Sequence, residues 1–143
     1  MAGGGCITGS RTAPRPAPGQ FTLSLPSVPL LPGEYLQQVE VEVRHGRVVS
    51  VNRLLDDWDA QVTWDNPELV TVSCQARHFS AGLADTKALT EFLTVESSGN
   101  LPMAITATVH TSSCDPAERP DRVLTVGESE LALRPVSSGD KVR

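Results

Sequence analysis

The chain has 143 residues, which is the length of one domain. Its formal net charge of −5 argues against nucleic acid as the main partner, because neutralising phosphates needs clustered Lys and Arg side chains. No run of about 18 apolar residues is present, so we expect no transmembrane segment. The sequence contains no complete catalytic or cofactor motif, and we expect neither an enzyme nor a bound cofactor.

Composition divides the chain into a central body and two tails. Residues 1–19 are rich in glycine and proline and nearly lack large apolar side chains, so they cannot bury enough surface to offset the entropy of ordering. We expect a flexible tether there. Residues 136–143 are polar and predict a loose C-terminal tail. The body, residues 20–135, is expected to form a single β-sandwich domain.

The dominant pattern inside the body is an alternation of apolar and polar residues with a period of two. Segments of this strand-like character occur at 20–25, 36–44, 47–53, 60–64, 70–78, 90–96, 103–112, 123–126 and 129–134. Turn-forming residues separate them, and this spacing predicts an antiparallel β-sandwich of about eight or nine strands, immunoglobulin-like or jelly-roll-like. Residues 83–89 predict one short helical turn, with Asp85 as its N-cap.

The two valine-rich segments on either side of residues 44–46 predict a β-hairpin. A three-residue loop pairs Val41 with Val49 and keeps the valines on one face, whereas a two-residue turn would divide them between both faces. The longer loop also puts Gly46 where a left-handed conformation is needed.

Two cysteines in the body are candidates for a disulfide. Cys74 shares strand parity with Val70 and Val72 and is expected to face the core, and Cys114 follows the strand that ends near residue 112. A Cys74–Cys114 bridge would close a loop of about 40 residues and contribute about 3–4 kcal/mol. The alternative is a pair of reduced thiols.

The third cysteine lies in the N-terminal tail. The string Ala-Gly-Gly-Gly-Cys at residues 2–6, followed by a polar, proline-rich stretch, resembles the cleavage region of bacterial lipoproteins. In that family the cysteine carries the lipid, so the resemblance implies a lipid anchor at Cys6. The family has an aliphatic residue where Gly3 stands, and the other interpretation is an incidental thiol in a tail.

A second resemblance covers residues 39–95. The run Gly46–Val51, the acidic Asp-Asp-Trp at 56–58 and the segment Leu89–Val95 are similar to secreted bacterial immunoglobulin-like and cohesin-like β-sandwich domains. The resemblance implies a fold and an extracytoplasmic location, either secreted, periplasmic or surface-anchored. We therefore expect a non-enzymatic module with a structural or protein-interaction role, whose partner is a protein or an envelope component.

The two tryptophans separate this interpretation from carbohydrate binding. Trp58, Ala60, Val62 and Trp64 form one continuous apolar face, so we expect both indoles in the core and a cost of about 3–5 kcal/mol for Trp64→Ala. The alternative is a polysaccharide-binding module in which exposed indoles stack on sugar rings. In that case the hydroxyl groups would be bound by neighbouring polar side chains, Asp57, Asp59, Asp65 and Asn66.

A calcium-binding site is considered because three carboxylates occur within four residues, those of Asp56, Asp57 and Asp59. They do not have the spacing of a calcium loop, and Glu96, Asp65 or Asp115 would have to complete the site. We expect a solvated acidic turn instead.

The histidines are considered as metal ligands and as part of a hydrolase site. His45, His78 and His110 have no metal-binding spacing. A remote alternative is a small hydrolase that uses Ser80, His110 and Asp85, but no nucleophile-elbow motif positions the serine.

Overall fold

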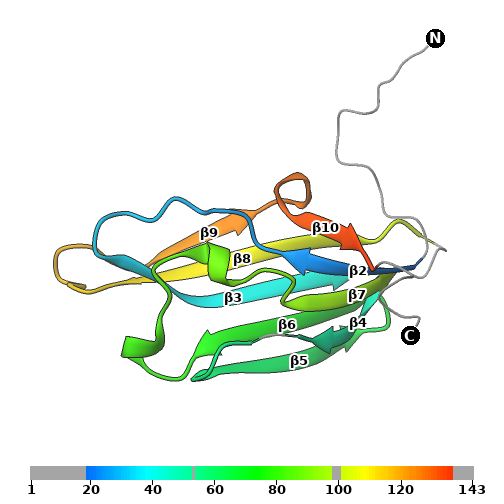
Figure 1. Cartoon of the computed structure of the whole chain (residues 1–143), viewed down its shortest axis with the longest axis horizontal. Helices are drawn as coiled ribbons and strands as arrows, with labels where there is room; N and C mark the ends of the chain where they lie inside the picture. Colours follow the sequence, from blue (N-terminus) through cyan, green and yellow to red (C-terminus); the bar gives the residue numbers. More distant parts are fainter. Residues whose placement is uncertain (1–18, 53, 98–100, 137–143) are drawn as a thin grey trace, which may run out of the picture.

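Two antiparallel sheets pack face to face in the computed structural model, which describes residues 19–52, 54–97 and 101–136 (Figure 1). Within these residues the strands are β2 (Gly19–Ser24), β3 (Glu34–Arg44), β4 (Gly46–Val51), β5 (Trp58–Asn66), β6 (Leu69–Ala76), β7 (Leu93–Ser97), β8 (Ala104–Ser113), β9 (Arg122–Val126) and β10 (Ala132–Pro135). One sheet has four strands in the order β10-β2-β7-β4, and the other has five in the order β5-β6-β3-β8-β9. The predicted antiparallel β-sandwich is confirmed.

The helical content of the described residues consists of three short 3-10 turns, η1 (Phe79–Ala81), η2 (Thr86–Ala88) and η3 (Glu128–Glu130). The predicted turn near 83–89 corresponds to η2. Its N-cap is Asp85, whose carboxylate accepts a hydrogen bond from the Lys87 amide at 2.9 Å. No helix in the described part of the chain is long and apolar enough to cross a membrane.

The core lies between the sheets and is built by the alternation seen in the sequence. Val41 of β3 is fully buried and stands between Val72 of β6 and Ala107 of β8, which are buried too. The same alternation continues along β3 and β8, so each contributes a continuous apolar face to the interior. Because one face of each strand is removed from water, the register of the five-stranded sheet is strongly specified.

The predicted hairpin at residues 44–46 is wrong, because β3 and β4 belong to different sheets. Both edges of β3 are occupied, by β6 and by β8, and the chain crosses at His45 to begin β4 beside β7. His45, not Gly46, has the positive φ, at 60°. Gly46 is needed for space, since a Cβ there would lie 2.7 Å from Sδ of the buried Met103.

The predicted Cys74–Cys114 disulfide does not form, and both thiols are free. Cys74 lies opposite Val39 in β3, whereas the Cys114 amide donates to the carbonyl of Gly33, just before β3 begins. This separation along β3 corresponds to roughly 20 Å, far beyond the Cα distance of about 7 Å that a bridge allows. Cys74 is a core side chain, and its burial raises the pKa of the thiol to about 11, which disfavours the thiolate.

A buried carboxylate at the start of β3 ties this strand to β9. The side chain of Glu34 is fully buried, and Arg122 binds it through two hydrogen bonds, Nε to Oε2 at 2.6 Å and Nη2 to Oε1 at 2.7 Å. The Leu31 amide and the Thr111 hydroxyl donate to the same carboxylate at 2.7 and 3.1 Å. The hydrogen bond from Arg122 is the main reason that the pKa of Glu34 falls to about 2, against the opposing effect of burial.

We expect Glu34→Gln to lower the melting temperature by several degrees at pH 7, because the variant loses the charge-assisted pair and leaves the Arg122 guanidinium without its carboxylate. The pKa of Glu34 is depressed in the folded state, so its stabilisation is present above about pH 4.5 and is lost as the pH falls toward 2. Thermal unfolding followed by circular dichroism should show the gap between wild type and variant closing over that range. Glu118→Gln, at an exposed position, is the control; a gap that does not change with pH would contradict the assignment.

Candidate functional site

One long side of the sandwich is left partly uncovered because the two sheets differ in width. β4 ends the four-stranded sheet and β5 ends the five-stranded sheet, and both run along the lower side of the molecule in Figure 1. β4 packs over β3 and β6. The inner face of β5 therefore projects beyond the sheet that covers its neighbours.

Val62 and Trp64 are the apolar side chains that this overhang exposes. In the register of β5 with β6 they lie opposite Val72 and Val70, which are fully buried on the same face. Val62 is nevertheless 42% exposed and Trp64 is 56% exposed. We call these two residues the apolar edge.

The apolar edge corrects the expectation that both tryptophans lie in the core. Trp58 is buried as predicted, with its indole Nε1 donating to the Ala81 carbonyl at 2.7 Å. The rest of the same face, from Ala60 to Trp64, is exposed. Strand parity determines which way a side chain points, but only the opposite sheet determines whether it is covered. Trp58 is thus unsuited to a sugar platform, and Trp64 alone has an accessible ring.

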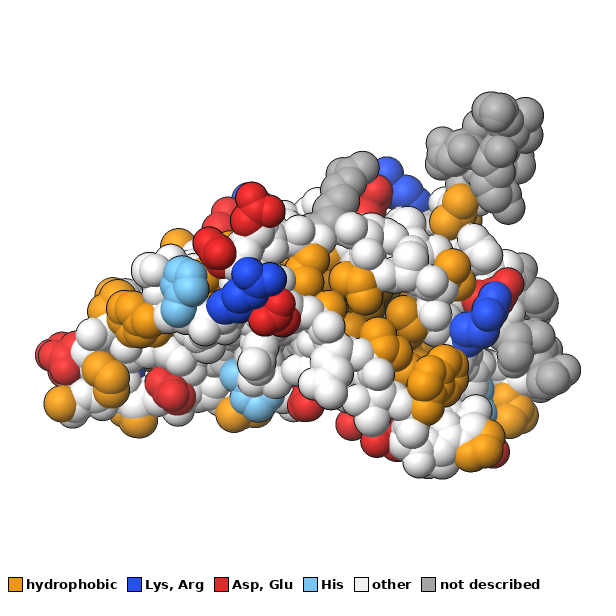
Figure 2. Space-filling model, turned by 90° about the horizontal axis from the view of Figure 1, so that it is seen from below, with side chains coloured by type: hydrophobic (Ala, Val, Ile, Leu, Met, Phe, Trp, Pro, Cys, Tyr) orange, Lys and Arg blue, Asp and Glu red, His pale blue; other side chains and the backbone are white. Residues whose placement is uncertain are grey.

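Further apolar side chains that are only partly buried lie in β4 and in the connection from β4 to β5. Val48 and Val51 of β4 face the interior opposite β7 and are half-buried, and Leu54 and Leu55 in the β4–β5 connection are half-buried as well. Figure 2, which looks at the molecule from below, shows hydrophobic side chains gathered in a hollow on this side. Exposed apolar side chains that gather on one side of a molecule are typical of an interaction site.

Carboxylates line the outer side and the ends of β5. Asp59 forms an ion pair with Arg77 at 3.0 Å, and Asp65 accepts a hydrogen bond from the Thr71 hydroxyl at 2.7 Å. At the two ends of the strand, Asp57 and Glu68 are exposed. Arg77 offsets the charge of Asp59. The negative charge that favours a positively charged ligand on this side is therefore that of Asp57, Asp65 and Glu68.

The acidic residues do not assemble into a metal site. No group of three or more His, Cys, Asp or Glu side chains that could hold a metal ion occurs among the described residues. Of the side chains considered as additional calcium ligands, Glu96 is paired with Arg47 at 2.7 Å, and Asp115 lies in the turn after β8. The structure leaves Asp56, Asp57 and Asp59 as an exposed acidic turn.

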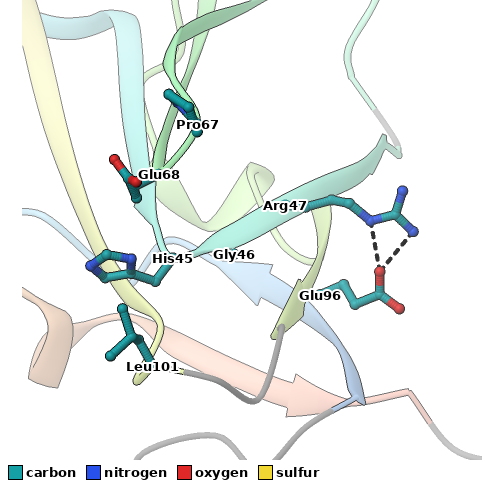
Figure 3. Close-up of a pocket in the computed structure, with 7 residues that line it drawn as sticks. All are labelled: His45, Gly46, Arg47, Pro67, Glu68, Glu96 and Leu101. Atoms are coloured by element: carbon teal, nitrogen blue, oxygen red, sulfur yellow. Dashed lines mark hydrogen bonds and ion pairs between the residues drawn. The ribbon is translucent and has the colours of Figure 1, made fainter.

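A pocket of about 320 Å³ lies at the sheet crossing, at the end of β5 that carries Trp64. Its lining residues are His45, Gly46, Arg47, Pro67, Glu68, Glu96 and Leu101. Figure 3 shows the Arg47–Glu96 ion pair on one side, and His45, Glu68 and Leu101 on the other. Sequence reasoning missed this pocket because the residues come from four segments that only the crossing brings together.

The residues considered for hydrolysis are not brought together. Ser80 contacts His78, with 3.0 Å between Oγ and Nδ1, and Asp85 caps η2. His110 lies on β8, where its Nε2 is 3.9 Å from the Glu40 carboxylate and makes no hydrogen bond.

A second contact of His78 completes a serine, histidine and aspartate series that sequence reasoning did not find. His78 Nε2 lies 3.9 Å from the Asp57 carboxylate, which is too long for a hydrogen bond. The imidazole and the carboxylate are both more than half exposed. The aspartate therefore does not hold the imidazole in the orientation that a catalytic triad requires.

Comparison with known proteins finds no matching family model, no matching curated protein and no matching solved structure.

We expect the two tryptophans to differ sharply in their contribution to stability. Trp58→Ala should cost about 3–5 kcal/mol, because it removes a buried ring, whereas Trp64→Ala should cost about half of that or less. Chemical denaturation of both variants measures the difference. In the single-tryptophan variants, acrylamide should quench Trp64 readily and Trp58 poorly. Equal shielding of the two indoles would contradict the exposed position of Trp64.

Proposed function

We propose that this chain is a non-enzymatic, extracytoplasmic binding module that holds a protein partner or an envelope component against the apolar edge. The observation that carries the proposal is the exposure of Trp64 and Val62 on a face where the residues opposite them in β6, Val70 and Val72, are fully buried. Covering these side chains would release the same kind of free energy that covering Val70 and Val72 releases in folding.

The residue types favour a protein interface. Tryptophan is enriched among the residues that dominate binding energy, particularly where it can enter a pocket on the partner and lose its remaining contact with water. Here Trp64 is held by a strand and not by a loop, which limits the entropy lost when it becomes ordered in a complex.

The extracytoplasmic location rests on the resemblances in the sequence. The lipoprotein-like string that ends at Cys6 lies outside the described residues, so the lipid anchor is part of this proposal. An anchored sandwich at the end of a proline-rich tether would present its apolar edge to partners at the cell surface.

Polysaccharide binding is the second candidate, and the exposed indole of Trp64 favours it. Asp65 and Asn66 follow directly and could bind sugar hydroxyls beside a ring stacked on Trp64. The buried Trp58 takes no part, so the platform would consist of a single aromatic side chain.

Site-specific photo-crosslinking in living cells tests the main proposal. A photoreactive phenylalanine analogue at position 64 should give a discrete crosslinked protein band. The same analogue at position 123 should give no such band. Val123 is 63% exposed, but it lies on the outer face of β9, at the opposite edge of the five-stranded sheet. Equal crosslinking from both positions, or none from position 64, would reject the apolar edge as the binding surface.

Affinity electrophoresis in gels that contain a soluble polysaccharide tests the alternative. Retardation that Trp64→Ala abolishes, together with an absence of crosslinked protein, would replace the protein partner by a carbohydrate.

A further inference from the structure

We propose that β5 binds its partner by strand addition, taking a cationic extended segment as a sixth strand of the five-stranded sheet. This inference rests on the proposed function and deepens it, because it names the chemistry of the partner. It follows from three features of β5: an open backbone edge, apolar side chains next to that edge, and carboxylates on the outer face.

The backbone groups of β5 alternate between β6 and the open edge. The Arg77 amide donates to the Asp57 carbonyl at 2.8 Å, so Asp57 is bonded across the ladder, whereas the Trp58 amide donates to the Leu55 carbonyl at 3.2 Å and not to β6. In an antiparallel pair such residues alternate with residues that point the other way. The N–H and C=O groups of Ala60, Val62 and Trp64 accordingly point away from β6. β5 ends its sheet, and no described strand pairs with that side.

The side chains beside these backbone groups suit an incoming strand. Val62 and Trp64 lie on the inner face, so an added strand would place every second side chain next to them, over the part of the face that β4 does not reach. A partner with small or branched apolar residues at alternate positions would extend the core sideways. Main-chain hydrogen bonds would provide affinity, and the inner-face contacts would provide specificity.

Charge selects a cationic partner over a second copy of this chain. If β5 paired with itself around Val62, Asp65 of each copy would stand opposite Asp59 of the other, whose own ion pair is with Arg77. Like charges directly opposite each other destabilise a strand pair, and each copy has a net charge of −5. Lys or Arg at the corresponding positions of a partner would instead face these carboxylates, and Glu68 in the pocket at the end of β5 is placed to meet a further cation.

A synthetic peptide tests strand addition on the full chain. The probe is a nine-residue peptide in which valine alternates with threonine and lysine and both ends carry arginine; its matched control has glutamate in place of every lysine and arginine. We expect the cationic peptide to bind at least about tenfold more tightly than the acidic one. In hydrogen exchange measured by NMR, binding should protect the amides of Ala60, Val62 and Trp64.

Three variants separate the contributions. Ala60→Pro removes an edge-facing N–H without removing an apolar ring, and it should weaken binding by about tenfold, whereas Ala60→Ser keeps the N–H and should bind like wild type. Asp65→Asn should weaken binding by about twofold to fivefold. Thermal unfolding of each variant checks that the sandwich remains folded, and the amide protection in wild type does not depend on any variant.

The following results would each contradict strand addition by a cationic segment. Binding that Trp64→Ala abolishes but that leaves the edge amides unprotected would mean docking of side chains without an added strand, and the proposed function would survive. Equal affinity for the cationic and acidic peptides would reject the charge argument. Failure of the peptide to bind, or a dimer in sedimentation that buries Trp64, would reject a cationic strand as the occupant. The photo-crosslinking experiment at position 64 tests the proposed function independently of the peptide experiments.

Discussion

The crossing of the chain between sheets at His45 is the constraint on which the exposed side of the molecule depends. Once β4 leaves for the other sheet, both edges of β3 are free for β6 and β8, and β5 can only extend the sheet beyond β6. The crossing is tight: the His45 amide donates to the Glu68 carbonyl at 2.8 Å, and Gly46 leaves room for Met103. A Cβ at position 46 would push against a buried side chain at the point where the two sheets join.

The alternation of apolar and polar residues explains which parts of this fold can be predicted from the sequence. A period of two tells which residues share a face, and it located the strands and the buried valines of β3, although the start of the segment expected at 129–134 forms η3. The turn at Asp85 was predicted from its N-cap residue. It does not encode which strand lies beside which. The hairpin expected at residues 44–46 was the locally consistent choice, but both edges of β3 pair with strands from elsewhere in the sequence, β6 and β8.

The candidate site was less predictable for the same reason. Trp58 and Trp64 have the same parity and opposite exposure, because coverage depends on the width of the other sheet. Cys74 and Cys114 each lie close to a predicted strand, yet their separation depends on the register of those strands with β3. The Glu34–Arg122 pair joins residues far apart in sequence, and its one local sign is a carboxylate at the start of a strand whose next two residues are buried.

An uncovered edge strand is a liability, and the residues around β5 both limit and direct what it can bind. Short edges, charges and bulges keep natural sheets from joining at random. β5 has a bulge after Trp64, and its carboxylates on the outer face oppose pairing with a second copy of itself. The opposite edge of the five-stranded sheet, β9, is protected in another way. This strand is short, and the ion pair of Arg122 with Glu34 holds it to β3. The β5 edge is long, apolar on its inner side and acidic on its outer side. Its charges therefore disfavour self-association while they favour a partner of opposite charge, so one set of carboxylates serves both solubility and selectivity.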